Sequence, residues 1–599
     1  MNDKIYKGFL ALLFLFVFVY LLLRIIYNET LHDEVATFIL YFYHGDYVGQ
    51  FMHWDANNHL LNSFIGHQLY EVFGDNFAIL RLPNLLAFIV YFFGTIKLTK
   101  SFKTPYLKLT SVIALNTIPF IMEYFANARG YGLSFGFFVW VLVHFINFQK
   151  TNDLRSLLYT YLFLILTVSA NLTFVNTCFI LLGINIFTFF FRNDTEILSH
   201  KFKEWLAHIG FLIFLSPFIY FGFLLREKGA LYYGSLDGLW EVTGKTLSRY
   251  ILFFDGDWLR YVYLLLFALL IVYLIIRLKS TKLKEWFKAP FVIYACLFFG
   301  NIVGILLLAW LLEVNYPEDR TGIYLAILFL LMLFYVFDNI KIGKWLQWLF
   351  LFFPISLLGH LSLHTSVFSP DDRMNNEFFA KVKEHTEPEN SIMIYHIMNW
   401  NWPYFESHYK NKSSVGLFSD PNSTLTDIIV TKTTVITNPN ISKLYDTIAI
   451  HPPSTYIAFK RKKSMIRNEI EVVIANDIAT NQEYYKLAVF DCDSLGASDI
   501  QVSVSGSLQT LESKNKIYLI VSTINKDGSN GRYFCYSFET AYQSQVIDDD
   551  FLHHFVLDKI SSEEKEIKVY LWNRGQHDYK LSNITTTLFE LKPPENESR

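Results

Sequence analysis

The sequence predicts a polytopic α-helical membrane protein with about eleven transmembrane helices, followed by a soluble α/β unit and a β-sandwich. Of the 599 residues, 52% are hydrophobic and only 18% are charged, which is more apolar than an ordinary soluble domain. Long apolar runs follow one another to about residue 363, and polar sequence with short alternating runs follows. The net charge of −3 gives no support for a nucleic-acid partner.

The apolar runs give the candidate spans, each close to the roughly 20 residues that cross a bilayer core. The first follows Lys4 and Lys7 and lacks a small-residue cleavage site, so we expect it to be retained as a helix. The spans are expected near residues 8–27, 77–96, 106–122, 132–148, 156–170, 173–191, 207–225, 259–277, 289–312, 322–338 and 345–363.

The distribution of basic residues predicts the orientation of these spans. Loops such as "KLTKSFKTPYLK" and "RLKSTKLKEWFK" are rich in lysine, whereas the alternate loops, among them 28–76 and 226–258, are less basic for their length. By the positive-inside rule the N-terminus is cytoplasmic. We therefore expect a multi-pass inner (plasma) membrane protein whose first outward loop, 28–76, and C-terminal domains are periplasmic or otherwise extracytoplasmic.

The polar part divides into two expected domains. In 364–465, a helix over 374–387 and the short runs "SIMIYHI", "DIIVT" and "TTVIT" predict a small α/β domain. In 466–599, runs such as "EIEVVIAN", "KIYLIVSTI" and "EIKVYLWN" recur with turn signals between them, which is typical of a β-sandwich.

The first outward loop places two adjacent acids, Asp33 and Glu34, close to the first span. Apolar residues at Val35, Phe38 and Ile39 have helical spacing, which predicts a helix along the membrane surface. One explanation of the acids is stabilisation of the helix N-terminus, worth roughly 0.3 to 1 kcal/mol. The alternative is a functional site beside the membrane.

Further polar residues on the same side favour the functional site. "EYFANARGYG" carries Arg129 and Tyr131 between two spans, "NYPEDRTGIY" carries Glu318, Asp319 and Arg320 before a later span, and Arg81 lies where the second span begins. Arginine offers a planar fork of donors that suits phosphate. Acids and arginines at the outer ends of spans therefore indicate a site that binds a lipid-linked anion and activates an acceptor.

The order of these motifs resembles the GT-C glycosyltransferases of the protein O-mannosyltransferase and lipid A aminoarabinose transferase superfamily. The resemblance rests on "DE" in the first loop, "NNHLLNS", "FGDNFAILRLPNLLAF", "ARGYGLSFGFF" and "EDRTGIYLAILFLLM", and it covers roughly residues 5–363. It implies transfer of a sugar from a polyprenyl-phosphate donor on the outer face of the membrane. It also implies that Asp33, with Glu34 beside it, is catalytic and that Arg81, Arg129 and Arg320 bind the donor phosphate.

The chemistry of such a transfer fits these residue types. A base for the attacking hydroxyl and positive charge for the departing phosphate are needed, and Asp33 and an arginine supply them. One base and a phosphate leaving group predict a single displacement with inversion. The remaining candidates for the pocket are Asp55, Asn57, Asn58, His59, Tyr131, Glu318 and Asp319.

Several alternatives remain open from the sequence. A divalent metal is possible, with His32, Asp33, His53 and His59 as candidate ligands, although no spacing matches a known signature. The acceptor is a protein, a lipid or a glycan. The same composition also fits three other classes of protein. These are a non-catalytic flippase, a polysaccharide export component and a membrane-anchored binding protein. The run "YLWNRGQHDYKLSNITTTLFEL" resembles the closing strands of carbohydrate-binding jelly rolls, so the sandwich is a candidate glycan-binding domain. A sandwich that contacts another protein, or one with a purely structural role, is the alternative.

Overall fold

The computed structural model describes residues 3–48, 54–191, 198–366, 368–369, 373–395, 400–409, 412, 415–418, 422–513, 515–543 and 545–594. The chain forms two compact units. The first comprises Met1–Asn28 and Leu40–Phe368, and the second comprises Glu29–Ile39 and Ser369–Arg599. Each unit is described by itself.

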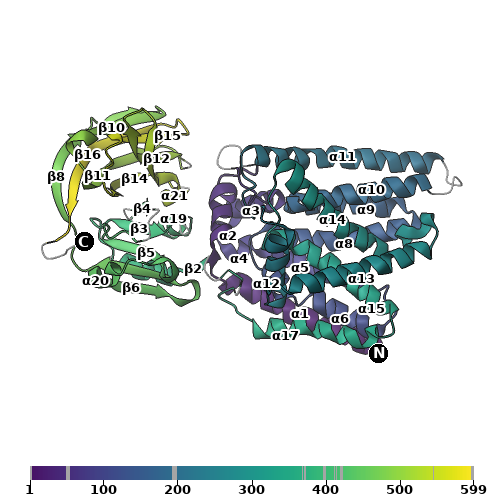
Figure 1. Cartoon of the computed structure of the whole chain (residues 1–599). Coiled ribbons are helices and arrows are strands. Elements are labelled where there is room, and N and C mark those ends of the chain that lie inside the picture. Colours follow the sequence, from purple (N-terminus) through teal and green to yellow (C-terminus); the bar gives the residue numbers. More distant parts are fainter. Residues whose placement is uncertain are drawn as a thin grey trace. The chain divides into compact units, whose positions relative to one another are not determined.

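The first unit is a bundle of membrane-length helices (Figure 1). Within the described residues, eight helical segments are long and apolar enough to cross a membrane. They are α1 (Asp3–Tyr27), α4–α5 (Phe77–Leu80 and Leu82–Thr99), α8 (Gly130–Thr151), η2–α10 (Leu172–Phe174 and Val175–Phe191), α11 (Leu198–Glu227), α13 (Leu259–Lys279), α14 (Pro290–Leu312) and η5–α15 (Asp319–Gly322 and Ile323–Asn339). The predicted multi-pass membrane architecture is confirmed.

The other three predicted spans are helical but shorter or interrupted. The run at 106–122 divides into α6 (Pro105–Leu115) and α7 (Pro119–Glu123), with Pro119 opening the second helix. The run at 156–170 is α9 (Leu154–Ala170). The last run forms the short helices α16 (Gly343–Leu346), η6 (Gln347–Leu351) and α17 (Phe352–Gly359).

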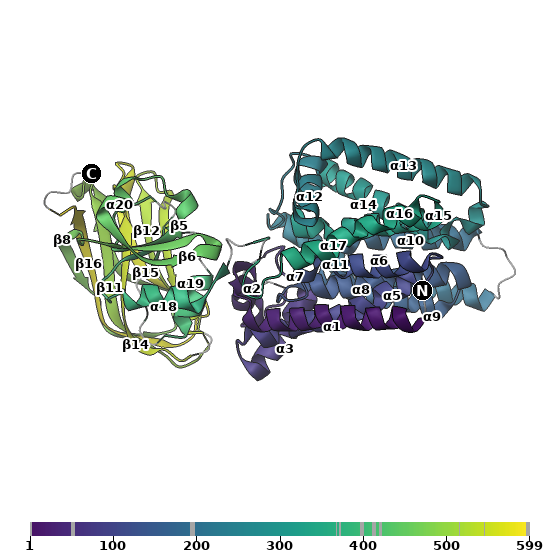
Figure 2. The same cartoon turned by 90° about the horizontal axis from the view of Figure 1, so that it is seen from below.

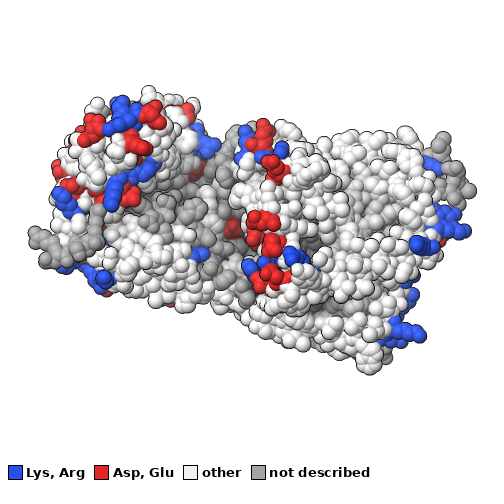
Figure 3. All heavy atoms as spheres, viewed as in Figure 1, with Lys and Arg blue, Asp and Glu red and all other residues white. Residues whose placement is uncertain are grey.

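Burial and charge are both ordered within this bundle. Figure 2 shows α1 and α13 on opposite sides with α8 between them, and α8 is the most buried of the long apolar segments. Figure 3 shows mostly uncharged side chains along the helices and charged ones at their ends. Ion pairs of Lys245 and Arg249 with aspartates precede α13, whereas Arg277 and Lys279 lie in its last turn. An apolar band between charged ends is the pattern of a membrane-embedded bundle.

The second unit includes a short segment of the first loop, which the sequence does not indicate. Strand β1 (Thr30–Leu31) pairs antiparallel with β2 (Arg373–Met374). Glu29 Oε1 accepts a 2.9 Å hydrogen bond from Asn375 and lies 3.2 Å from His451 Nε2. The segment that carries Asp33 and Glu34 is thereby attached to the second unit.

The α/β part of this unit contains a mixed sheet in the order β4-β3-β5-β7-β6. Its strands are β3 (Ile392–Tyr395), β4 (Val415–Phe418), β5 (Ile428–Lys432), β6 (Tyr445–His451) and β7 (Tyr456–Arg461), and its helices are α18 (Asn376–Glu384), α19 (Asn401–Ser407) and α20 (Asn440–Leu444). The prediction of a strand at "TTVIT" is wrong. Thr433–Val435 forms a 3₁₀ turn, because the chain leaves β5 there and turns toward α20.

The C-terminal part is the predicted β-sandwich. One sheet has the order β14-β11-β16-β8, with β9 also pairing with β16, and the other has the order β10-β15-β12-β13. All their neighbouring strands are antiparallel. The strands are β8 (Ile466–Ile474), β9 (Ile478–Thr480), β10 (Tyr484–Asp491), β11 (Asp499–Thr510), β12 (Ile517–Asn525), β13 (Asn530–Ser537), β14 (Asp548–Leu557), β15 (Glu564–Asn573) and β16 (Tyr579–Lys592).

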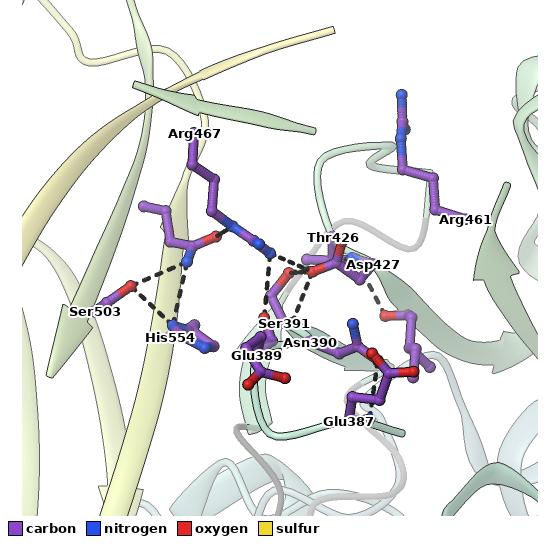
Figure 4. A network of polar contacts seen from close by, with 12 residues as sticks. Glu387, Glu389, Asn390, Ser391, Thr426, Asp427, Arg461, Arg467, Ser503 and His554 are labelled. Carbon is purple, nitrogen blue, oxygen red and sulfur yellow. Dashed lines mark hydrogen bonds and ion pairs between the residues drawn. The ribbon is translucent and has the colours of Figure 1, made fainter. Parts of the chain in front are cut away.

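A polar network joins the α/β part to the sandwich (Figure 4). Arg467, on β8, donates from Nη2 to Asp427 Oδ2 at 2.6 Å and to the Glu389 carbonyl at 3.2 Å. The backbone N–H of Ser391 donates to the same carboxylate oxygen at 2.9 Å. Arg467 Nε donates to Gln501 at 3.2 Å, which continues the network into the sandwich.

Candidate functional site

The acidic pair lies in the first turn of α2 (His32–Thr37), which continues into the π-helical turn η1 (Phe38–Phe42). The helix predicted for the first loop is therefore present. Glu34 is buried, and its Oε2 accepts a 3.3 Å hydrogen bond from the Leu31 N–H, as in the capping arrangement of a helix N-terminus. Asp33 is only partly buried. Of the two acids, Asp33 is the more accessible.

Buried arginines hold the last turn of α1, directly before the acidic segment. Arg81 Nη1 donates to the carbonyls of Asn28 at 2.8 Å and Ile25 at 3.3 Å. Arg24 Nη2 lies 2.9 Å from Glu123 Oε1, and both side chains are buried. These contacts satisfy the carbonyl end of α1 and pair a charge that would otherwise be costly to bury. Through them, Arg81 positions the start of the first loop.

Arg129 forms a polar corner at the N-terminus of α8. Its Nη2 donates to Asn57 Oδ1, and its guanidinium carbon lies 5.8 Å from the ring centre of Tyr131. Asp55 Oδ1 accepts from the Asn57 N–H at 2.8 Å, and Asp55 Oδ2 accepts from the Tyr232 hydroxyl at 3.1 Å. The loop "WDANN" is thus fixed between α8 and the 230–233 segment.

His59 and Asn58 extend this corner. His59 Nδ1 lies 2.8 Å from the Ala170 carbonyl, so this nitrogen carries the proton and donates. The imidazole packs edge-on against Tyr131, with ring centres 4.6 Å apart. Asn58 Nδ2 donates to the Tyr47 carbonyl at 2.6 Å, and Asn58 Oδ1 accepts from the Ser63 hydroxyl at 2.8 Å.

A glycine is required where this corner packs most closely. A Cβ on Gly130 would lie 2.1 Å from the Ala170 carbonyl oxygen and 2.6 Å from His59 Cβ. Neither distance is possible without movement of the backbone. The sequence "RGYG" therefore allows Arg129 and Tyr131 to flank a position where two helices and His59 meet.

A second polar group lies at the start of α15. Tyr233 donates from its hydroxyl to Asp319 Oδ2 at 2.5 Å and accepts from Arg320 Nη1 at 2.9 Å. The Arg320 guanidinium also lies over the Tyr233 ring, 4.4 Å from its centre. Burial raises the pKa of Tyr233 well above its usual value, so this hydroxyl stays protonated. Partial burial, and then the Asp319 charge, raise the pKa of Glu318.

These two polar groups border one cavity of about 390 Å³ in the first unit. Its polar lining includes Asn58, His59, Tyr131 and Tyr233. Its apolar walls are formed largely by α10, α11 and α14 and include Leu172, Phe179, Phe218, Ile219, Phe223, Ile305 and Leu308. Arg129 and Arg320 each contact one of the lining tyrosines. A cavity with a polar end and apolar walls suits a ligand with a polar head and an apolar chain.

The predicted site residues therefore separate into three sets. Asn58, His59 and Tyr131 line the cavity, and Asp55, Asn57, Arg129, Asp319 and Arg320 lie in the hydrogen-bonded groups beside it. Glu318 adjoins Asp319 at the N-cap of η5. Arg81 contacts the end of α1, and Asp33, Glu34 and His32 belong to the second unit.

Among the cavity residues that were not predicted from the sequence are Tyr233 and Arg226. Tyr233 lies in the loop between α11 and η3 (Trp240–Gly244), and Arg226 lies in the last turn of α11. Arg226 Nε donates to the Leu312 carbonyl at 2.8 Å. No local motif identifies either residue, because their neighbours in the cavity come from distant helices.

The possible metal site is not assembled in the part of the chain that the structure describes. In those residues no group of three or more His, Cys, Asp and Glu side chains could hold a metal ion. Of the four candidate ligands, His53 lies outside the described residues, and His59 directs Nδ1 to a backbone carbonyl.

No family model and no curated protein matches the chain. Among solved structures it resembles ArnT from Cupriavidus metallidurans in the apo state, with 12% identity over 76% of this chain and 98% of ArnT and a TM-score of 0.37. It also resembles ArnT from the same organism bound to undecaprenyl phosphate, with 12% identity over 77% of this chain and 98% of ArnT and a TM-score of 0.39. The arabinosyltransferase EmbB from Mycobacterium smegmatis matches with 10% identity over 99% of this chain and 64% of EmbB and a TM-score of 0.33.

All three TM-scores are below 0.5. The functional roles below are therefore derived from this chain's own residues.

Proposed function

We propose that this protein is a membrane glycosyltransferase that transfers a sugar from a polyprenyl-phosphate donor to an acceptor on the outer face of the membrane. The observation that carries the proposal is the cavity of about 390 Å³, which has a polar end beside Arg129 and Arg320 and apolar walls between membrane helices. A polyprenyl-phosphate sugar has the same division between an anionic head and an apolar chain.

The donor phosphate binds at the polar end. Arg129 and Arg320 are both held by aromatic and hydrogen-bonding partners, so their charges are already oriented before a ligand arrives. Oriented positive charge of this kind stabilises a departing phosphate more than mobile charge in water does. Tyr131 and Tyr233 line the space between these arginines and the ligand.

The polyprenyl chain lies along the apolar walls. Phe179, Phe218 and Leu308 come from three different membrane helices, so the chain would be surrounded by side chains at bilayer depth. Burying it there gains roughly 25 cal/mol for each Å² of apolar surface removed from water, although a lipid already in the bilayer gains much less.

Asp33 is the proposed catalytic base. It is the more accessible acid of the pair, whereas Glu34 is buried and engaged with the Leu31 N–H. In the reaction, the acceptor hydroxyl oxygen bonds to the anomeric carbon as the bond from that carbon to the phosphate oxygen breaks. Asp33 takes the hydroxyl proton, and the polyprenyl phosphate leaves with the bonding electrons. A single displacement inverts the anomeric configuration.

The expected topology puts this reaction outside the cytoplasm. The N-terminus is then cytoplasmic, and the ends of α1, α7 and α14 that adjoin the polar groups face outward. The transferred sugar is a hexose or a pentose under this proposal, and the acceptor is a protein, lipid or glycan hydroxyl.

The test uses the full-length protein in nanodiscs with polyprenyl-phosphate sugars extracted from the host membrane. Release of polyprenyl phosphate and the mass of the glycosylated acceptor are followed by mass spectrometry. We expect Asp33→Asn to lower the rate by about 10² to 10⁴-fold, because a positioned base contributes that much. The control is Glu71→Gln, since Glu71 is a half-exposed acid in the same loop.

Wild-type turnover by Asp33→Asn would refute the assignment of Asp33 as the base, but not the proposed glycosyltransferase activity. If the wild-type protein moved the donor between leaflets without releasing polyprenyl phosphate, a flippase would be the correct function. A proteoliposome assay that separates leaflet exchange from phosphate release distinguishes these outcomes.

A further inference from the structure

A row of aromatic side chains crosses one face of the sandwich. In the sheet β10-β15-β12-β13, Tyr484 is the cross-strand neighbour of Trp572, and Trp572 is the neighbour of Tyr518. The Tyr484 and Trp572 rings are parallel within 4°, with centres 6.1 Å apart, and the Tyr518 ring lies 5.5 Å from Trp572. Tyr570, one position along the same face, lies 6.2 Å from Tyr484.

This row faces away from the hydrophobic core. Along β15, Ile567, Val569 and Leu571 are fully buried in the sandwich core, so the alternate residues Tyr570 and Trp572 project from the opposite face. Tyr484 is 56% exposed. The row is therefore not part of the packing between the sheets: Tyr484 is exposed, and Trp572 and Tyr518 are partly buried.

Polar groups hold the aromatic rings in place. Trp572 Nε1 donates to Glu483 Oε1 at 3.3 Å, and the Tyr518 hydroxyl donates to Glu539 Oε2. The Arg574 guanidinium lies 5.7 Å from the Trp572 ring centre. Side chains fixed in this way lose little conformational freedom when a ligand binds.

The charges on this face identify the class of ligand. Charges of both signs lie along this face, with Lys486, Lys568 and Arg574 among the cations and Glu483, Glu539, Glu566 and Asp491 among the anions. A surface of mixed charge with donors and acceptors beside flat rings complements an uncharged ligand that is rich in hydroxyl groups. Sugar rings present apolar C–H faces to aromatic rings and hydroxyl groups at their edges.

We propose that Tyr484, Trp572 and Tyr518 form a binding face for an uncharged oligosaccharide of pyranose units. The sugar rings stack on this aromatic row, and Glu483, Arg574 and Lys486 bind their hydroxyl groups. This site is separate from the cavity of the first unit and does not depend on the glycosyltransferase proposal.

The test measures retention of the full-length protein in detergent on gels or columns that carry uncharged polysaccharides. The panel is mannan, amylose, laminarin, xylan and galactan, with their hexasaccharides as soluble competitors in calorimetry. We expect at least one of them to bind, and Trp572→Ala and Tyr484→Ala to weaken the affinity at least tenfold. Tyr484→Phe keeps the ring and should bind like the wild type.

The control for a general loss of exposed apolar surface is Ile474→Ala, since Ile474 is 76% exposed on the other sheet. Circular dichroism and thermal unfolding establish that each variant is folded, and Trp572→Phe replaces Trp572→Ala if the latter unfolds. Failure of the wild type to bind any member of the panel would overturn the proposal. So would affinity that survives Trp572→Phe and Tyr484→Ala together, or binding only to phospholipid vesicles or to alginate.

Discussion

The two units both bury ion pairs, but they use them differently. In the helical unit, Arg24 pairs with Glu123 at 2.9 Å with both side chains buried. In the second unit, Arg467 pairs with Asp427 at 2.6 Å, with Asp427 buried and Arg467 partly exposed. A buried pair costs free energy to desolvate and is therefore weak evidence for stability alone.

The surroundings of the charges separate the two cases. The contacts of Arg467 and Asp427 lead to other protein groups, and this network joins two parts of one unit (Figure 4). Beside Arg129 and Arg320, by contrast, the contacting tyrosines line a cavity. Burial of charge thus indicates a ligand site only where a cavity adjoins it, and substitutions should affect turnover in one unit and stability in the other.

Among the charges compared between the two units, the largest effect is expected at Arg129. Arg129→Ala should lower the rate of transfer about 10² to 10³-fold, as for loss of one oriented donor in an active site. Arg129→Lys should recover only part of the rate, because an ammonium lacks the planar fork that contacts Asn57 and the phosphate together. Release of polyprenyl phosphate is the readout, with thermal unfolding as the control. Equal rates for all three proteins would contradict the assignment.

Acid should selectively weaken the sandwich. Burial, with a smaller effect of His554, lowers the pKa of His553 to about 3. Burial, and then Arg467, lower the pKa of His554 to about 4, while Asp427 and Glu389 act in the opposite direction. Unfolded histidine titrates near 6.5, so the unfolded chain takes up protons first as the pH falls.

The stability that these two neutral histidines contribute is therefore fully present above about pH 6.5 and is lost as the pH falls toward 4. From pH 7 to 5 the loss should be about 2 to 4 kcal/mol. Hydrogen exchange of peptides from β14 measures it, and His553→Phe should make the dependence shallower. His577→Gln, at a half-exposed histidine paired with Glu512, is the control and should leave the slope unchanged. Identical slopes for the wild type and His553→Phe would refute the assignment.

A smaller effect is expected at the junction in the second unit. Asp427→Ala removes the partner of Arg467 and the acceptor of the Ser391 N–H. It should cost about 2 kcal/mol, less than a fully buried pair, because Arg467 is partly exposed. The transfer rate at a temperature where the variant is folded should not change. Chemical denaturation and the transfer assay check both parts, and a large loss of rate without loss of stability would contradict the comparison.

Apolar runs and alternating strands were sufficient to predict the architecture, because membrane spans and sandwich strands each bury a face with a regular period. Local motifs also predicted Arg129, Tyr131, Asp319 and Arg320 as site residues, and the structure places them in or beside the cavity. The cavity itself was not predictable, since Tyr233 reaches it from a loop and Arg226 from the end of α11. Neither was the attachment of Glu29–Ile39 to β2, which depends on pairing between residues more than 340 positions apart.

The most direct test of the central claim is photo-crosslinking of the wild-type protein in nanodiscs with a polyprenyl phosphate that carries a diazirine on its chain. Labelled peptides are mapped by mass spectrometry. The predicted result is label concentrated in residues 172–179 and 218–226, and excess undecaprenyl phosphate should displace this label. Label distributed over lipid-facing helices such as α13, with no competition by undecaprenyl phosphate, would contradict the account.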